Sequence, residues 1–201
     1  DEIVLKIIKK IQNIMKAQGI KVDIGIDIAA SSFFNIYSRK YNYKNIKKEL
    51  NSKEQINYIS RLIKKYNLLY VEDPLNENDF SGFRELLKKV KKFNKNCLIV
   101  GDDLTTTNPN RLKLAIKNKS INAIIIKPNQ IGSLLKVKEV IDLAKKNKIK
   151  TIISHRSGET LDDTIADLAI AWNCNFIKTG IYGKVREVKL KRLIDIEKSL
   201  I

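Results

Sequence analysis

The chain contains few cysteines, with only two among its 201 residues. Cys97 and Cys174 lie far apart and lack the short spacing of a metal site, so we expect two free thiols and neither a disulfide nor a zinc site. Free thiols are typical of a reducing compartment. The cysteine content therefore favours a cytoplasmic protein.

Long apolar runs are also missing. No stretch approaches the about 20 consecutive apolar residues that would span a bilayer. No positively charged segment precedes an apolar run at the start of the sequence, as a secretory signal would require. The sequence predicts neither a membrane-spanning nor a secreted protein.

Acidic residues are scarce beside basic ones, 22 against 39, and the net charge is +17. A strongly basic chain can bind nucleic acid. Here the lysines are spread over nearly every predicted helix, and aromatic residues do not alternate with them as on a base-stacking surface. We expect no specific nucleic-acid binding, although the charge would attract a substrate that carries phosphate and carboxylate groups.

The first segment, residues 2–18, predicts an amphipathic helix. Ile3, Ile7, Ile11 and Ile14 recur at helical spacing, and lysines occupy the other face. Such a helix could lie on a membrane surface. A predicted strand follows at once, which favours a helix packed on a barrel.

Short segments rich in Ile, Val and Leu alternate with helical segments along the rest of the chain, as in a buried parallel sheet. We predict strands near residues 22–27, 68–72, 97–101, 122–127, 150–154 and 176–179. Helix starts are predicted at Ser52 with Gln55, at Asn108–Pro109, and at Thr160 with Asp163.

This repetition is typical of an open doubly wound sheet or of a closed barrel. No Gly-rich phosphate loop follows the first strand, so the barrel is favoured. A closed barrel has eight strands, and roughly a quarter of that wall has no counterpart here. The predicted fold class is α/β, a partial (β/α)8 TIM-type barrel with six strand–helix units, and residues 1–201 are expected to form one incomplete barrel domain.

Charged side chains stand at the ends of the predicted strands, where a barrel of this kind builds its active site. In chain order they are Asp27, Glu72, Asp102, Lys127, His155 and Lys178. One acid in such a place could equally cap a helix or form an ion pair. Three acids at one level would repel one another in a purely structural network, whereas together they suit Mg²⁺, which prefers oxygen ligands.

Several short motifs accompany these charged residues. They are Gly25–Asp27, Val71–Pro74, Gly101–Thr105, Lys127–Gly132, Ser154–Thr160 and Ile177–Gly180. Together, and in this order, they resemble the motifs of enolases. The run Ser-His-Arg-Ser-Gly-Glu-Thr at Ser154–Thr160 is the most specific of them, and the resemblance extends from about residue 24 to residue 180.

The resemblance implies an activity. Enolases (phosphopyruvate hydratases) are cytoplasmic carbon–oxygen lyases of glycolysis and gluconeogenesis that use Mg²⁺ to dehydrate 2-phosphoglycerate to phosphoenolpyruvate. By this resemblance Asp27, Glu72 and Asp102 are the metal ligands, and Glu72 and Asp102 also border the substrate. Lys127 is the general base, and Lys178 contacts the substrate carboxylate.

A phosphate site is implied at His155, Arg156 and Ser157, with His155 near the reacting end of the substrate. We expect this segment to lie directly before a helix, where free N–H groups and the helix dipole favour an anion. Arg156 would add a bidentate donor and Ser157 a hydroxyl.

The family pattern also implies parts that this sequence does not show, namely an upstream glutamate that acts as the acid, the first barrel strands and a small N-terminal domain. We expect the chain to be the C-terminal part of the enzyme, inactive alone, with a homo-oligomer (a dimer or larger) in the complete enzyme. Two alternatives stay open: another lyase of the wider enolase superfamily acting on a different carboxylate, which would lack the Ser154–Thr160 run, and a non-catalytic remnant that serves as a binding module.

Overall fold

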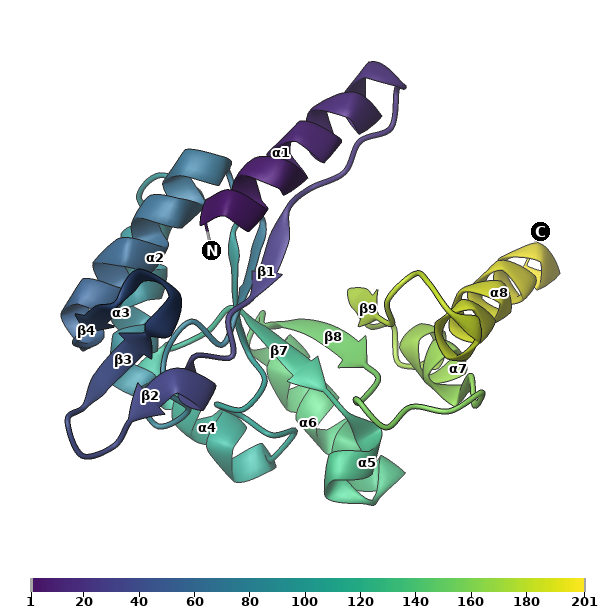
Figure 1. Ribbon diagram of the computed structural model, residues 1–201. Helices are drawn as coiled ribbons and strands as arrows, with labels where there is room; N and C mark the ends of the chain where they lie inside the picture. The colour runs from purple at the N-terminus through teal and green to yellow at the C-terminus, as the bar shows by residue number, and fades with distance from the viewer. Residues whose placement is uncertain (1, 201) are drawn as a thin grey trace. The chain divides into compact units, whose positions relative to one another are not determined.

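The computed structural model describes residues 2–200, apart from the Ile46 side chain, and divides into two compact units. The first comprises residues 2–104 and Leu114–Asn122, and the second comprises Thr105–Lys113 and residues 123–200. Each unit contains three parallel strands, and helices connect them (Figure 1). The six predicted strands are all present.

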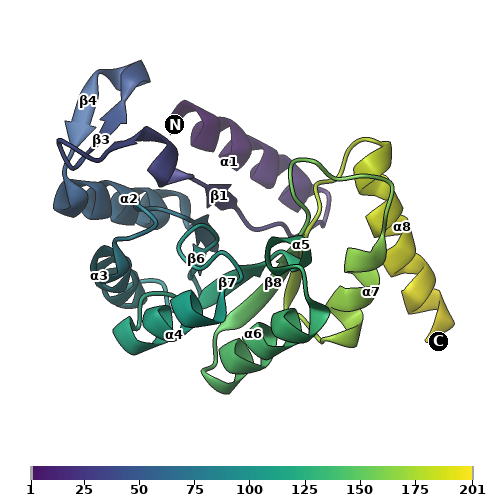
Figure 2. The same ribbon diagram turned by 90° about the horizontal axis from the view of Figure 1, so that it is seen from below.

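The first unit is built on strands β1 (Gly25–Asp27), β5 (Tyr70–Glu72) and β6 (Leu98–Gly101). Asp27 pairs with Glu72, and Glu72 pairs with Val100, in parallel register. Helices α2 (Ser52–Tyr66) and α3 (Phe80–Lys91) lie side by side (Figure 2). Their apolar faces are buried and form a large part of the core, through Ile56, Ile59, Ile63, Phe83, Leu86 and Val90.

A small antiparallel sheet, which the sequence did not predict, lies between β1 and α2. It consists of β2 (Phe34–Asn35), β3 (Lys40–Tyr43) and β4 (Lys48–Leu50), with the 3-10 turns η1 (Ala30–Phe33) and η2 (Lys44–Ile46) at its connections. Tyr41 is fully buried, and its hydroxyl accepts the Asn76 N–H at 2.8 Å. The strands are too short to show a periodic pattern of apolar residues. The only local indication of this sheet is a turn, in which the Asn35 side chain accepts the N–H groups of Tyr37 and Ser38.

The first helix, α1 (Glu2–Ala17), forms as predicted but does not bury its apolar stripe. Ile3, Ile7, Ile11 and Ile14 are between 51% and 72% exposed, and Leu5 is its only buried residue. Contact with α2 is confined to the first turn, where Glu2 bonds Lys65 at 2.8 Å, and the other end of α1 extends away from α2 (Figure 1). The predicted packing of this helix on the barrel is therefore wrong for the described residues.

The second unit is built on β7 (Ala123–Ile126), β8 (Lys150–Ser154) and β9 (Phe176–Lys178). Ile126 pairs with Ile153, and Ser154 pairs with Lys178. The short helix α5 (Pro128–Ile131) and the longer α6 (Leu134–Lys146) follow β7, whereas α7 (Thr164–Ala171) precedes β9 and α8 (Lys184–Ser199) follows it. Helix α4 (Pro109–Asn118) begins in this unit and ends in the first.

Helix starts were predicted with mixed success. Asn108 is confirmed as a cap, because its side chain accepts the N–H groups of Asn110 and Arg111. The capping box of α2 lies one residue earlier than predicted: Asn51 accepts the Glu54 N–H, and the Glu54 side chain accepts the Asn51 N–H. Thr160 does not cap α7, which begins at Thr164.

Within residues 2–200, no helix is both long and apolar enough to cross a bilayer. Cys97 and Cys174 are free thiols, as predicted.

We expect the substitution Asn51→Ala to lower the free energy of unfolding by about 1 kcal/mol, because it removes the side chain that caps the start of α2. Urea denaturation followed by circular dichroism would measure it. Lys53→Ala, an exposed change in the same turn, is the matched control and should stay within about 0.5 kcal/mol of wild type. Equal stabilities of the two variants would contradict the assignment of the cap.

Candidate active site

Three acidic residues lie at the ends of the first unit's parallel strands. Asp27 and Glu72 are direct partners, and Glu72 is the partner of Val100, two residues before Asp102. Because partners in parallel register point to the same side, Asp27 and Glu72 share one face, and Asp102 follows directly after the last residue of β6, Gly101. The register thus gathers the predicted metal ligands at the ends of three neighbouring strands.

Two of these acids are buried, with Glu72 1% and Asp102 8% exposed, whereas Asp27 is exposed. The Tyr70 hydroxyl donates a hydrogen bond to Glu72 Oε2. Burial raises the pKa of Tyr70 far above its usual range, and the charges of Glu72, Asp27 and Asp102 add to the effect. Tyr70 therefore stays protonated and remains a donor amid the acids, a role that sequence analysis missed.

Gly25 permits the close approach of Tyr70 to β1. A Cβ atom at this position would lie 3.0 Å from the Tyr70 Cβ. Any larger residue would push the phenol away from the acids that it faces.

Asp73, directly after Glu72, is also buried, at 3% exposure. Its Oδ1 accepts the Asp102 N–H at 3.0 Å, and its Oδ2 accepts the Asp103 N–H at 2.7 Å. Burial raises the pKa of Asp73 to about 7, a shift that the two N–H donors oppose and that the charges of Asp103 and Asp102 increase. This residue lay within a predicted motif, but no role had been predicted for it.

Carboxylate oxygens of Asp73, Asp102 and Asp103 lie within 4.8 Å of one another. This cluster shares only Asp102 with the three predicted metal ligands. Both groups offer oxygen donors alone, which is the chemistry that Mg²⁺ prefers. The donor set at this edge of the strands therefore fits a hard divalent cation.

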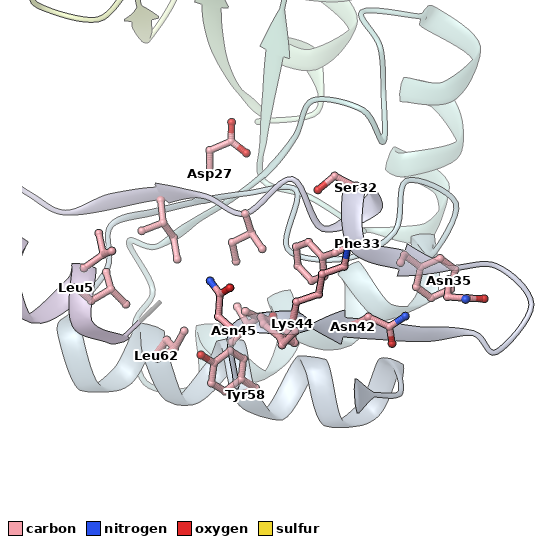
Figure 3. A pocket seen from close by; sticks show the side chains of 16 residues that line it. Leu5, Asp27, Ser32, Phe33, Asn35, Asn42, Lys44, Asn45, Tyr58 and Leu62 are labelled. Carbon is pink, nitrogen blue, oxygen red and sulfur yellow. The ribbon is translucent and has the colours of Figure 1, made fainter. Parts of the chain in front are cut away.

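A large cavity also lies in the first unit, with a volume of about 710 Å³ (Figure 3). Ile26 and Ile28 line it, together with Leu5, Phe33 and Leu62. Asp27 borders the cavity, but its carboxylate points away from the other labelled side chains (Figure 3). The cavity thus opens on the face of β1 opposite to the acids.

In the second unit, Lys127 and Lys178 occupy the strand ends predicted for them. Because Ile126 pairs with Ile153, Lys127 follows at the level of Ser154, which itself pairs with Lys178. The two lysines thus stand on the same face, with the strand of Ser154 between them. Both side chains are half-buried.

Thr107 fixes the backbone at Lys127. Its Oγ1 accepts the Lys127 N–H and donates to Gln130 Oε1, each at 2.9 Å. Thr107 is fully buried and, like Thr106, has a positive φ, which is rare for a β-branched residue. Such local strain clusters at functional sites, and no sequence pattern indicates it here.

The predicted phosphate segment does not lie directly before a helix. His155, Arg156 and Ser157 belong to an irregular loop, and α7 begins only at Thr164. The expectation of a helix dipole there is wrong, because Asp162 and Asp163 interpose another turn whose Asp162 side chain accepts the Thr164 N–H. Arg156 and Ser157 are exposed, and so is the guanidinium that a phosphate would need.

Buried charges hold this loop to α8. Lys189 Nζ donates to Glu159 Oε2 at 3.2 Å and to the carbonyl oxygens of Thr160 and Val185. Burial raises the pKa of Glu159, but bonds from Lys189 and Arg186 outweigh this and hold it below its usual value. His155 Nδ1 lies 3.7 Å from Glu159 Oε2.

The residues that carry these motifs also lie within the part of the chain that is similar to known proteins. A family model described as "Enolase, C-terminal TIM barrel domain" matches residues 2–201. The chain belongs to the enolase family. This confirms the predicted fold class, a partial α/β barrel of the TIM type, and identifies the family as one of lyases.

Curated enolases from archaea are similar over nearly the whole chain. The enolase of Methanocorpusculum labreanum is 49% identical over 179 residues, which cover 89% of this chain and 44% of that protein. The enolase of Methanosphaera stadtmanae is 48% identical, covering 91% and 44%, and that of Picrophilus torridus is 45% identical, covering 100% and 49%. The chain spans about half the length of the curated relatives it matches.

His155 should titrate below its ordinary pKa of 6.5, because burial lowers the pKa more than the Glu159 carboxylate raises it. As the only histidine, it gives one unambiguous imidazole signal in a proton NMR titration. Glu159→Gln should lower the midpoint further. The folded chain then binds this proton less readily than the unfolded chain, so stability should fall as the pH drops below 6.5. A midpoint above 6.5 would contradict this.

Lys189→Met should lower the free energy of unfolding by about 3 kcal/mol, because it removes a buried cation and leaves Glu159 and two carbonyl groups without that donor. Chemical denaturation would measure the change. Lys191→Met alters an exposed lysine of the same helix and is the matched control. A Lys189→Met chain as stable as the control would show that the buried contacts do not hold the loop.

Proposed function

We propose that the chain is the C-terminal part of an enzyme that dehydrates 2-phosphoglycerate to phosphoenolpyruvate in a Mg²⁺-dependent reaction of cytoplasmic glycolysis and gluconeogenesis. The observation that carries the proposal is the set of charged residues at the ends of the parallel strands, in the order of the enolase motifs. Family membership and the names of the relatives support it.

Asp27, Glu72 and Asp102 would hold the metal ion. When bound, Mg²⁺ supplies positive charge that stabilises the doubly charged carboxylate formed when the adjacent carbon loses its proton. Tyr70 would orient Glu72 through its hydroxyl. The parallel register of Asp27 and Glu72 on neighbouring strands supports a shared ion.

Lys127 would act as the general base. Its neutral amine would take the proton from the carbon that bears the substrate carboxylate. Thr107 keeps the Lys127 backbone in place, so that the amine moves only through its own side chain. Lys178, on the same face one strand beyond Ser154, would bind the carboxylate as a cation.

The phosphate would bind at His155, Arg156 and Ser157. The exposed Arg156 offers two parallel N–H donors, which match phosphate oxygens. His155, kept neutral near pH 7 by its lowered pKa, would act as a hydrogen-bond donor close to the reacting end of the substrate. Positioning of the loop would rest on Glu159 and Lys189, since α7 begins only at Thr164.

The acid that protonates the departing hydroxyl would come from outside this chain, as would the remaining barrel strands. We therefore propose that residues 1–201 act as one barrel domain within a longer or two-piece enzyme, which assembles as a homo-oligomer. Turnover of 2-phosphoglycerate by the purified 201-residue chain at an ordinary enzymatic rate would contradict this part of the proposal.

Calorimetric titration with phosphoenolpyruvate tests the site itself. We expect binding that requires Mg²⁺ and that Asp102→Asn and Lys127→Ala each weaken at least about tenfold, because the first removes a proposed metal ligand and the second the proposed general base. Asp142→Asn removes an exposed carboxylate paired with Lys138 and should leave binding unchanged. A chain that does not bind the ligand in the presence of Mg²⁺ would instead be a non-catalytic remnant.

A further inference from the structure

We infer that Asp73 is a positioning residue, whose carboxylate sets the backbone that carries the metal ligand Asp102. The inference rests on the proposed function, since it assigns a task within the same metal site. It concerns only residues of the first unit.

The side chain of Asp73 accepts hydrogen bonds from both peptide groups that flank the α-carbon of Asp102. Oδ1 accepts the N–H of Asp102, and Oδ2 accepts the N–H of Asp103. These residues follow directly after β6, where regular strand pairing has ended at Gly101. The carboxylate therefore replaces the missing strand partner and fixes the direction in which Asp102 leaves the sheet.

The backbone of Asp73 links the other two strand ends. Its N–H donates to the Val100 carbonyl at 3.1 Å, and its own carbonyl accepts the Ala30 N–H at 3.1 Å. One residue earlier, the Glu72 carbonyl accepts the Ile28 N–H at 3.0 Å. Asp73 thus joins the segments that carry Asp27, Glu72 and Asp102.

The conformation of Asp73 fits such a task. Its φ is 39°, in the left-handed region that Asp and Asn tolerate better than most other residues. In this conformation the carboxylate meets the N–H groups of Asp102 and Asp103, directly after β6. Asn is consequently the right test, because it keeps the volume and the backbone conformation but presents an NH₂ group to one of the two N–H donors.

Asp79 provides a matched control. Its Oδ1 accepts the Gly82 N–H at 2.8 Å at the start of α3, and its Oδ2 accepts the Ser52 hydroxyl at 2.5 Å. Like Asp73, it is an aspartate that holds backbone in the first unit, but it does so at a helix cap. Asn caps a helix as well as Asp does, so Asp79→Asn should cost little.

The test compares Mg²⁺ binding to the full chain in wild type, Asp73→Asn and Asp79→Asn by isothermal titration calorimetry. We expect Asp73→Asn to weaken binding by about tenfold to a hundredfold, as is usual when the support of a metal ligand is removed. Asp79→Asn should bind like wild type. Without metal, amide hydrogen exchange of Asp102 and Asp103 should be slow in wild type and in Asp79→Asn, and faster in Asp73→Asn.

The outcomes separate the two claims. A wild-type chain that binds no Mg²⁺ would contradict the proposed metal site, and with it the role of Asp73 toward a metal. A wild type that binds, together with an Asp73→Asn variant whose affinity is within about twofold of it, would overturn the inference about Asp73 alone. Should Asp73→Asn fail to fold, the wild-type amides still decide, because rapid exchange at Asp102 and Asp103 would overturn the inference.

Discussion

Parallel register at the ends of β1, β5 and β6 is the constraint on which the acidic site depends. Side chains alternate between faces along a strand, so a slip of one residue would turn Asp27 away from Glu72. The core formed by α2 and α3 opposes such a slip, because it would also expose buried residues such as Val71 and Ile99. Hydrophobic packing on one side of the strands thereby fixes the chemistry on the other.

Holding buried acids close together costs free energy, and hydrogen bonds to the carboxylates offset part of it. The Tyr70 hydroxyl serves Glu72, and two backbone N–H groups serve Asp73. In the second unit, hydrogen bonds likewise offset the cost of burying a lysine, since Lys189 donates to one carboxylate and two carbonyl oxygens. These hydrogen bonds also connect segments that no strand pairing joins: Asp73 holds the residues after β6, and Lys189 holds the loop at Glu159.

The sequence predicts those features that come from repetition and fails on those that come from individual contacts. Runs of Ile and Val located all six parallel strands to within about three residues, because a buried parallel strand needs little except apolar β-formers. The sequence did not predict the antiparallel sheet of Phe34–Leu50, since its strands have two to four residues and depend on one buried tyrosine, Tyr41. Helix boundaries were off wherever several capping residues stood together, as at Asn51 and Ser52.

The same division applies to the site. Motifs and strand ends were enough to name Asp27, Glu72 and Asp102, and the register places Asp27 beside Glu72. The sequence analysis missed Tyr70, Asp73 and Thr107, which act through hydrogen bonds to other residues. Asp73 and Thr107 bond backbone groups that are distant in sequence, and Tyr70 bonds Glu72, which lies on the same face of its own strand. Strand alternation could have suggested the pair Tyr70 and Glu72, whereas no spacing in the sequence shows the partners of Asp73 and Thr107. The loop after Ser154 was expected to use a helix dipole, but it is held by Glu159 and Lys189.

The cavity in the first unit shows why the acids, and not an apolar hollow, indicate the function. Apolar, concave space is the usual default for a binding site. Here the hollow beside Ile26 and Ile28 is apolar because those side chains alternate with Asp27 along β1. One strand thus presents a hydrophobic face to the cavity and a metal ligand to the opposite side. A function assigned from cavity volume alone would be placed beside Ile26 and Ile28, on the face of the chain opposite to the Asp27 carboxylate.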